Sequence, residues 1–245
     1  MSDPKKYGLI GAKLAHSFSQ NYFTEKFDKQ NINAIYLNYE LNSVEAIKDL
    51  INQGDLIGVN VTIPYKEQIL PLLDELDSLA AELGAVNTIK FIEGKTKGFN
   101  TDVFGFKQMI KPFFKSHHER AMILGTGGAS KAVAYVLEEL GSKLIFISRN
   151  PKGKDQFHYS EINEYMMKFN PLIVNTTPLG TFPGIDEMPD VPVEFITPEH
   201  LVIDLIYNPE RSKLLQLAAS KGATVLNGRT MLEQQAEKSW EIWNE

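Results

Sequence analysis

Cysteine is absent from the 245-residue chain, which excludes disulfides, cysteine nucleophiles, iron–sulfur clusters and zinc sites built from cysteine. Long apolar runs are absent as well. The first apolar stretch follows two lysines, is broken by Lys13 and His16, and is too short for the core of a signal peptide. No later stretch approaches the roughly 18 residues of a membrane span. We therefore expect a cytoplasmic protein.

An excess of positive charge is also lacking, because 25 Lys and Arg residues stand against 31 Asp and Glu residues, for a formal net charge of −6. General affinity for nucleic acid or for an anionic membrane is therefore not expected. The five histidines have no spacing typical of a metal site, so we expect no metal. The composition, with 43% apolar and 23% charged residues, is that of a globular protein with one large domain or two smaller ones. It leaves open whether the protein is a monomer or a homodimer.

Strand-like apolar runs alternate with helical stretches along almost the whole chain. This alternation predicts parallel sheets built from right-handed β-α-β units, so the predicted fold class is α/β. The expected strands are 5–11, 34–41, 56–63, 120–126, 143–149, 171–177, 201–207 and 223–227. The expected helices are 20–30, 43–53, 127–141 and 229–244.

The alternation restarts near residue 120, after a segment (98–119) that is typical of a strand end followed by a helix. We therefore expect two domains with a cleft between them. The first is residues 1–101, with a mostly parallel sheet, and the second is residues 102–228. The amphipathic segment 229–245 is predicted to return to the first domain and to complete it.

A glycine-rich turn joins the strand that begins at Arg120 to the helix that follows. Its residues are Gly125, Thr126, Gly127, Gly128, Ala129 and Ser130. A strand, a glycine turn and a helix in this order are typical of a dinucleotide site, because glycines let a diphosphate approach the N–H groups at the start of the helix. The alternative is a turn that serves only the packing of the helix on the sheet.

The next strand ends in Ser148, Arg149 and Asn150, and Lys152 and Lys154 follow before the first acidic residue. An NAD site usually has Asp or Glu near this position to bind a ribose hydroxyl. Basic residues suit the 2′-phosphate of NADP instead, so we expect NADP(H) as the cofactor. The alternative is a basic cluster that only faces solvent.

Polar clusters follow the strands in the first half of the chain. Ser17 and Ser19 lie in a loop where both hydroxyls can point at one anion, although a serine there more often caps the next helix. Lys66 follows a strand and a proline, where an exposed, salt-bridging lysine is the usual interpretation. Asn87 and Asp102 are each open to interpretation as turn or cap residues.

A series of motifs occurs in the order seen in shikimate dehydrogenases, which the chain resembles from about Gly8 to Trp243. The motifs are HSFS, NVTIPYKE, GAVNT, GFNTDVFG, GTGGAS, NTTPLG, DLIYNP and NGRTMLEQQA. The resemblance implies an N-terminal α/β substrate domain, an NADP-binding Rossmann-like domain, and a last helix that returns to the first domain. It also implies the NADPH-dependent reduction of 3-dehydroshikimate to shikimate, in the biosynthesis of chorismate and the aromatic amino acids.

The resemblance further implies roles for single residues. Lys66 and Asp102 match the catalytic pair, in which Lys66 is the main acid and base and Asp102 orients it and contacts the substrate. The residues that match substrate ligands are Ser17 and Ser19 for the carboxylate, assisted by Tyr207, and Thr62, Asn87 and Gln235 for the ring hydroxyls. The residues that match cofactor ligands are Gly125, Gly127, Gly128, Ala129 and Ser130 for the diphosphate, Arg149 for the 2′-phosphate, and Gly228 and Met231 for the nicotinamide.

Two features depart from the family pattern. Ser148, Arg149 and Asn150 replace the usual Asn-Arg-Thr, and the segment 150–170 is short, with room for about one helix. We therefore expect a trimmed edge of the second domain, on the adenosine side.

Other functions remain open at this point. A quinate/shikimate dehydrogenase with relaxed use of NAD and NADP is the nearest alternative. A methylene-tetrahydrofolate dehydrogenase would need neither the paired serines nor the NTD motif. A catalytically silent NADP-binding regulator would have no need to keep both Lys66 and Asp102.

Overall fold

The computed structural model describes residues 3–14, 17–52 and 54–245. The chain forms two compact units, one made of Met1–Gly105 with Leu232–Glu245 and the other of Phe106–Met231. The expected boundaries, after residues 101 and 228, lie a few residues before the observed ones, which follow Gly105 and Met231. The expected cleft between the two units stays a prediction.

The first unit contains a six-stranded sheet with the order β2-β1-β3-β5-β6-β4. Its strands are β1 (Lys5–Gly11), β2 (Ala34–Glu40), β3 (Leu56–Val61), β4 (Glu75–Leu76), β5 (Thr88–Ile92) and β6 (Lys95–Phe99). β1 pairs in parallel with β2 and β3, and β4 with β6, whereas β3–β5 and β5–β6 are antiparallel. The sheet is therefore mostly parallel, as predicted, and β5 alone runs opposite to the other five strands.

The unpredicted part is the hairpin formed by β5 and β6. Ile92 pairs with Lys95, so the turn consists of Glu93 and Gly94 alone. Both residues have a positive φ, 50° and 80°, as in the two-residue turns whose twist matches that of the flanking strands.

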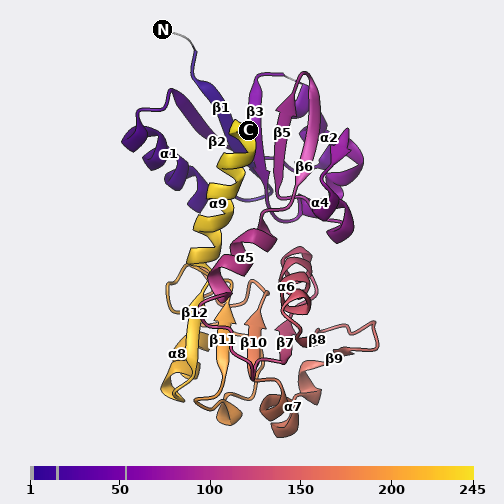
Figure 1. Ribbon diagram of the computed structural model, residues 1–245, viewed down its shortest axis with the longest axis vertical. Coiled ribbons are helices and arrows are strands. Elements are labelled where there is room, and N and C mark those ends of the chain that lie inside the picture. The colour runs from indigo at the N-terminus through magenta and orange to yellow at the C-terminus, as the bar shows by residue number, and fades with distance from the viewer. Residues whose placement is uncertain (1–2, 15–16, 53) are drawn as a thin grey trace. The chain divides into compact units, whose positions relative to one another are not determined.

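Helices cover both faces of this sheet (Figure 1). They are α1 (Phe18–Gln30), α2 (Val44–Asn52), α3 (Tyr65–Gln68), α4 (Ser78–Leu83) and α9 (Arg229–Asn244), with a 3₁₀ turn at Leu70–Leu72. Side chains alternate along β1: Tyr7 and Leu9 pack with residues of α1 and α9, whereas Ile10 packs with residues of α2. α9 packs on the first unit as expected, and Trp243 Nε1 donates to the carbonyl of Ile89 at 3.0 Å.

The second unit contains a six-stranded, fully parallel sheet with the order β12-β11-β10-β7-β8-β9. Its strands are β7 (Arg120–Leu124), β8 (Lys143–Ile147), β9 (Gln156–Phe157), β10 (Leu172–Asn175), β11 (Leu201–Asp204) and β12 (Thr224–Asn227). The strand order reverses between β7 and β10. In a doubly wound sheet the ligand site lies at the carboxyl ends of the strands at such a reversal.

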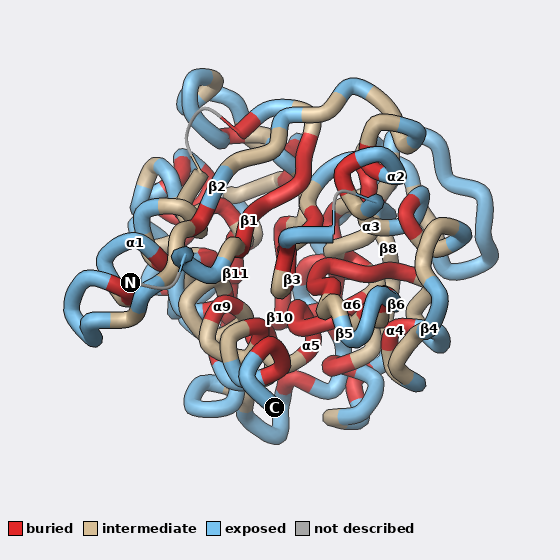
Figure 2. Tube along the Cα trace, turned by 90° about the horizontal axis from the view of Figure 1, so that it is seen from above, coloured by how far each residue is buried: buried red, intermediate tan, exposed pale blue. Residues whose placement is uncertain are grey.

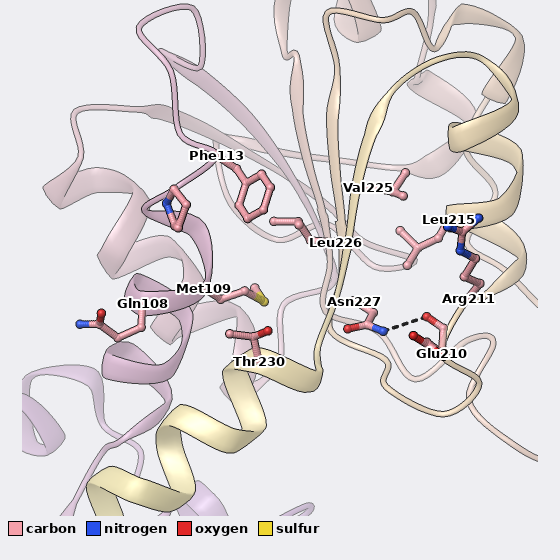
Figure 3. Close-up of a pocket in the computed structure, with 11 residues that line it drawn as sticks. Gln108, Met109, Phe113, Glu210, Arg211, Leu215, Val225, Leu226, Asn227 and Thr230 are labelled. Carbon is pink, nitrogen blue, oxygen red and sulfur yellow. Dashed lines mark hydrogen bonds between the residues drawn. The ribbon is translucent and has the colours of Figure 1, made fainter.

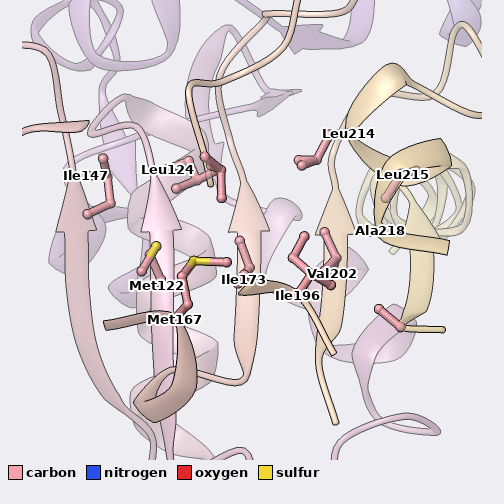
Figure 4. Packing of buried hydrophobic residues seen from close by; sticks show 12 residues of the cluster. Met122, Leu124, Ile147, Met167, Ile173, Ile196, Val202, Leu214, Leu215 and Ala218 are labelled. Atoms are coloured by element: carbon pink, nitrogen blue, oxygen red, sulfur yellow. The ribbon is translucent and has the colours of Figure 1, made fainter. Parts of the chain in front are cut away.

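The core of the second unit lies on both faces of its central strands. On one face, Figure 4 shows Met122 of β7 beside Met167 of α7 (Glu164–Phe169), and Leu214 of α8 (Lys213–Ser220) belongs to the same cluster further along the sheet. On the other face, Ala121 and Ile123 of β7 are buried as well. The other helices are α5 (Asp102–Ile110), which begins in the first unit, and α6 (Gly128–Glu139), with 3₁₀ turns at Tyr159–Glu161 and Val193–Phe195. Figure 2 shows how strongly burial is concentrated in central strands such as β3 and β10.

The short segment 150–170 holds one α-helix, α7, as expected. It also holds the two-residue strand β9 and a 3₁₀ turn. β9 pairs in parallel with β8 and forms the edge of the sheet. The short segment therefore still supplies an edge strand to the sheet, although that strand has only two residues.

Candidate active site

Lys66 and Asp102 form an ion pair in the first unit. Lys66 lies on α3, just after β3, and Asp102 is the first residue of α5. Lys66 Nζ is 2.7 Å from Asp102 Oδ2, and the exposed fractions of the two side chains are 16% and 2%. The carboxylate is thus shielded from water while the amine keeps some access to it. Lys66 is not the fully exposed, salt-bridging lysine of the alternative interpretation.

Asn87 fixes the second oxygen of this carboxylate. The backbone N–H of Thr101 donates to Asn87 Oδ1 at 2.7 Å, and because an N–H can only donate, the amide nitrogen of Asn87 must face the other way. That nitrogen donates to Asp102 Oδ1 at 2.9 Å and to Gln235 Oε1 at 3.4 Å. The structure therefore brings together Lys66, Asn87, Asp102 and Gln235.

A buried polar network lies behind Asn87, and sequence reasoning missed its members. Asn60 Nδ2 donates to Ser239 Oγ at 2.9 Å, and the hydroxyls of Ser239 and Thr88 are 2.8 Å apart. Asn60 belongs to the motif NVTIPYKE and Thr88 to the motif GAVNT. The only sequence signal for Ser239 is its position four residues after Gln235, on the same face of α9.

The other predicted substrate ligands of the first unit are Ser17, Ser19 and Thr62. Ser17 caps α1, because its hydroxyl oxygen accepts from the backbone N–H of Gln20 at 3.2 Å; the capping interpretation is confirmed. A capping serine still has its own hydrogen to donate to an anion. Ser19 lies in the first turn of α1, and Thr62 donates its backbone N–H to Ile10 at 2.9 Å. Among the described residues, no hydrogen bond joins these three side chains to Lys66 or Asp102.

The glycine loop of the second unit fits a diphosphate. Gly125 has a φ of +104°, which favours glycine, and donates its N–H to Ile147 at 2.8 Å. Gly127 caps α6 with ordinary extended backbone, and a Cβ added there would meet no atom within 4 Å. The first N–H groups of a helix have no partner four residues earlier. Ser130 N donates to the carbonyl of Gly127 at 3.0 Å, whereas no backbone hydrogen bond from Gly128 N or Ala129 N is found among the described residues. The hydroxyl of Ser130 donates to the carbonyl of Gly127 at 2.6 Å and holds the loop.

Arg149 lies at the carboxyl end of β8, beside the glycine loop. Two hydrogen bonds hold the backbone on either side of Arg149. Ser148 N donates to the carbonyl of Phe157 at 2.9 Å, and Asn150 N donates to Ser148 Oγ at 3.2 Å. Arg149, Lys152 and Lys154 are exposed, and no salt bridge engages any of them in the part of the chain that the structure describes. The position offers positive charge to a phosphate.

Gly228, Met231 and Tyr207 lie after the last two strands. A Cβ at Gly228 would lie 2.0 Å from the carbonyl oxygen of Leu205, so only glycine fits this close approach. Gly228 N donates to the carbonyl of Ile206 at 3.0 Å, which places it against the segment that carries Tyr207. Met231 is buried, with 5% of its surface exposed.

A cavity of about 320 Å³ lies elsewhere in the second unit, around the edge strand β12. Figure 3 shows Met109 and Phe113 on one side of this strand and Leu215 on the other. None of the residues predicted from the motifs lines it. The cavity is therefore not the site that the motifs build.

Asp204 is a completely buried carboxylate at the end of β11. Burial raises its pKa to about 6, while hydrogen bonds from Ser212, Ile206 and Asn175 act in the opposite direction. The folded protein therefore binds this proton more tightly than the unfolded chain does. The resulting stabilisation is fully present below the ordinary pKa of 3.8 and is lost as the pH rises through about 6.

Asp204→Asn removes this titration and keeps the shape of the side chain. A shift of about two pKa units corresponds to about 3 kcal/mol. We therefore expect the free energy of unfolding of the variant, relative to the wild type, to rise by up to about 3 kcal/mol between about pH 4 and pH 8. Urea unfolding measures it. Burial also lowers the pKa of His118 to about 4. His118 titrates in both the variant and the wild type, so its contribution cancels in the difference between their free energies of unfolding. A difference that does not change with pH would contradict the assignment.

Residues 9–89 match the model of the shikimate dehydrogenase substrate-binding domain. A shikimate dehydrogenase (NADP(+)) of Halothermothrix orenii is 36% identical, over 96% of this chain and 89% of the relative. The shikimate 5-dehydrogenase of Thermus thermophilus, solved with NADP(H) and shikimate, has a TM-score of 0.87 at 29% identity, covering 98% of this chain and 93% of that one. Quinate dehydrogenase of Corynebacterium glutamicum, solved with NAD, also has a TM-score of 0.87, at 28% identity and covering 99% and 94%.

Proposed function

The chain belongs to the shikimate dehydrogenase family, and from this premise we propose that it interconverts 3-dehydroshikimate and shikimate with NADP(H). This reaction belongs to the biosynthesis of chorismate and the aromatic amino acids. The observation that carries the proposal is the geometry of Lys66, Asp102 and Asn87, in which a partly accessible amine is held by a buried and doubly hydrogen-bonded carboxylate.

Lys66 and Asp102 act on the oxygen of the reacting carbonyl. When bound, NADP(H) supplies or accepts the hydride. Lys66 Nζ stabilises the negative charge that develops on the oxygen and donates the proton that completes the hydroxyl. Asp102 holds this amine at 2.7 Å, and Asn87 keeps the carboxylate from rotating because it occupies the second oxygen. In shikimate oxidation the same groups accept the proton.

The remaining predicted residues bind and orient the ligands. Ser17 and Ser19, assisted by Tyr207, bind the carboxylate of the substrate, and Thr62, Asn87 and Gln235 bind its ring hydroxyls. The glycine loop from Gly125 to Ser130 binds the diphosphate of the cofactor, Gly228 and Met231 lie at its nicotinamide end, and Arg149 binds its 2′-phosphate. The open space at Gly127 and the exposed cations after β8 support the cofactor assignments.

The direct test is the rise in absorbance of the reduced nicotinamide, NADPH or NADH, when the protein is mixed with shikimate or quinate and with NADP or NAD. Turnover with shikimate and NADP, and much slower turnover with the other pairs, is expected. Faster turnover of quinate would instead support the quinate/shikimate alternative, to which the quinate relative points. Folded protein without activity on any pair would contradict the proposal.

Arg149→Gln is expected to raise the KM for NADP about tenfold or more and to leave the KM for NAD within about twofold. The reason is that only NADP carries the 2′-phosphate that this guanidinium pairs with. Steady-state kinetics with each cofactor measures the effect. Arg120→Gln, an exposed arginine at the opposite end of β7, is the matched control. Equal losses with NADP and NAD would contradict the role of Arg149.

The proposed substrate and cofactor are small molecules, and no nucleic acid or membrane is required for the reaction. Among the helices of the described residues, none has both the length and the apolarity to span a membrane. A cytoplasmic location, and the choice between a monomer and a homodimer, stay predictions.

A further inference from the structure

Asp204 is a buried ionisable group that the proposed mechanism does not use. It lies at the carboxyl end of β11 with no exposed surface, and no salt bridge engages it among the described residues. Its carboxylate accepts hydrogen bonds from Ser212 Oγ at 2.5 Å, Asn175 Nδ2 at 2.9 Å and the backbone N–H of Ile206 at 3.1 Å. A buried carboxylate without a cation is costly, so its presence at this position calls for an explanation.

On one side, Asp204 is joined to the segment that follows β10. The N–H and the hydroxyl of Thr177 donate to Asn175 Oδ1 at 2.9 and 2.7 Å, so the amide nitrogen of Asn175 faces Asp204. The neighbouring Thr176 donates both its N–H and its hydroxyl to the carbonyl of Leu124, at 2.9 and 2.7 Å. Leu124 directly precedes Gly125. This side of the network therefore ends at the glycine loop.

On the other side, Asp204 is joined to Gly228. Its Oδ1 holds the N–H of Ile206, and the carbonyl of Ile206 accepts from Gly228 N at 3.0 Å. The contact is tight, because a Cβ at Gly228 would lie 2.0 Å from the carbonyl oxygen of Leu205. A shift of residues 205 and 206 would therefore shift Gly228.

We propose that Asp204 is a positioning residue for the cofactor: its carboxylate fixes the segments after β10 and β11, and through Thr176 and Ile206 it fixes the glycine loop and Gly228. The inference rests on the proposed function, which assigns these two elements to the diphosphate and the nicotinamide. It gives the buried carboxylate a reason to be there, since one acceptor group joins the donors of several separate segments.

The role requires an acceptor and not a negative charge. In Asp204→Asn, the amide oxygen can accept from Asn175 and Ile206, and the amide nitrogen can donate to Ser212, whose hydroxyl also accepts. In Asp204→Ala no acceptor remains and the buried donors lose their partner. The two variants therefore separate the hydrogen-bonding role from the charge.

The experiment is a titration of each variant with NADPH, followed by the fluorescence of the reduced nicotinamide near neutral pH. We expect Asp204→Asn to bind within about twofold of the wild type and Asp204→Ala to bind about tenfold more weakly or worse. The matched control is His200→Gln. His200 is buried beside the amino end of the same strand, where its ring contacts Thr197 and Met167, so its loss disturbs the core but not the cofactor loops. It is expected to bind NADPH within about twofold of the wild type.

Folded Asp204→Ala that binds NADPH like the wild type would overturn the inference, as would Asp204→Asn that loses as much affinity as Asp204→Ala. If Asp204→Ala does not fold, Asn175→Ala replaces it, because this change breaks the link from Asp204 Oδ1 through Asn175 to Thr177; a loss of about threefold is expected. Unchanged affinity in folded Asn175→Ala would then overturn the inference. Wild-type protein that fails to bind NADPH would instead overturn the proposed function, and the inference with it.

Discussion

Replacing Lys66 by alanine is expected to lower kcat for shikimate oxidation by a factor of roughly 10³ or more, while the Kd for NADPH stays within about threefold of the wild type. The substitution removes the amine that is proposed to exchange the proton and to stabilise the charged oxygen, and alanine has no group that does either. The predicted cofactor loop belongs to the other unit of the chain, so its donors are unchanged. Steady-state kinetics measures kcat, and titration by nucleotide fluorescence measures Kd.

Lys97→Ala is the matched control for this prediction. Lys97 lies on β6 of the same unit, is 36% exposed, and is 3.9 Å from the exposed Glu75. Exposed pairs of this kind contribute little, so kcat is expected to stay near that of the wild type. A loss of NADPH binding in Lys66→Ala as large as its loss of turnover would contradict the assignment.

A double variant tests whether Asp102 acts through Lys66. If it does, Lys66→Ala with Asp102→Ala is expected to be only slightly slower than Lys66→Ala alone, because residues that act as a unit are not additive. The single Lys66→Ala variant leaves a buried carboxylate without its cation, and its melting temperature is therefore expected to fall. Losses in kcat that multiply would contradict a shared role.

The sequence predicts the elements with strong periodicity and clear ends. Strand 5–11 and helix 229–244 match β1 and α9 residue for residue. Strands expected to run to residues 177 and 207 end earlier, at Asn175 and Asp204. In both cases the side chain of the last residue accepts a backbone N–H two residues further on, which is a local turn that competes with the strand.

The β5–β6 hairpin could not be predicted from periodicity. Lys90, Lys95 and Lys97 make its strands polar, and the strands are short. The antiparallel pairing of β5 with β3 depends on tertiary structure, because the residues of β5 could pair with β3 in either direction. The pair Glu93 and Gly94 is the one local signal of the turn.

The proposed catalytic pair shows a similar limit. Lys66 and Asp102 are 36 positions apart and, taken alone, each has an ordinary structural interpretation. The resemblance to a family singles them out, and the structure adds the 2.7 Å contact and the fixed direction of the Asn87 amide. Ser239 lies in none of the motifs. Its hydroxyl meets that of Thr88 because α9 packs on the first unit, and the local sequence does not indicate this contact.

Gly127→Asp is expected to change stability and cofactor affinity in opposite directions. Gly127 is the N-cap of α6, with φ −86° and ψ −174°, and aspartate is one of the best N-cap residues. Its Cβ would meet nothing within 4 Å, and its charge favours the helix N-terminus. We therefore expect the free energy of unfolding to stay level or rise by about 0.5–1 kcal/mol. The carboxylate would occupy the place proposed for the diphosphate and repel it, so the Kd for NADPH is expected to rise by a factor of roughly 10³.

Two further variants separate the causes of that loss. Gly127→Asn adds a side chain of nearly the same size without charge and also caps the helix, so it is expected to bind NADPH more weakly than the wild type but better than Gly127→Asp. Gly228→Ala, unlike the Gly127 variants, is expected to lower the melting temperature, because its Cβ would lie 2.0 Å from the carbonyl oxygen of Leu205. Thermal unfolding and nucleotide titration follow both quantities. Gly127→Asp that binds NADPH like the wild type would mean that the glycine turn serves only the start of α6, because the space in front of this helix would then hold no phosphate.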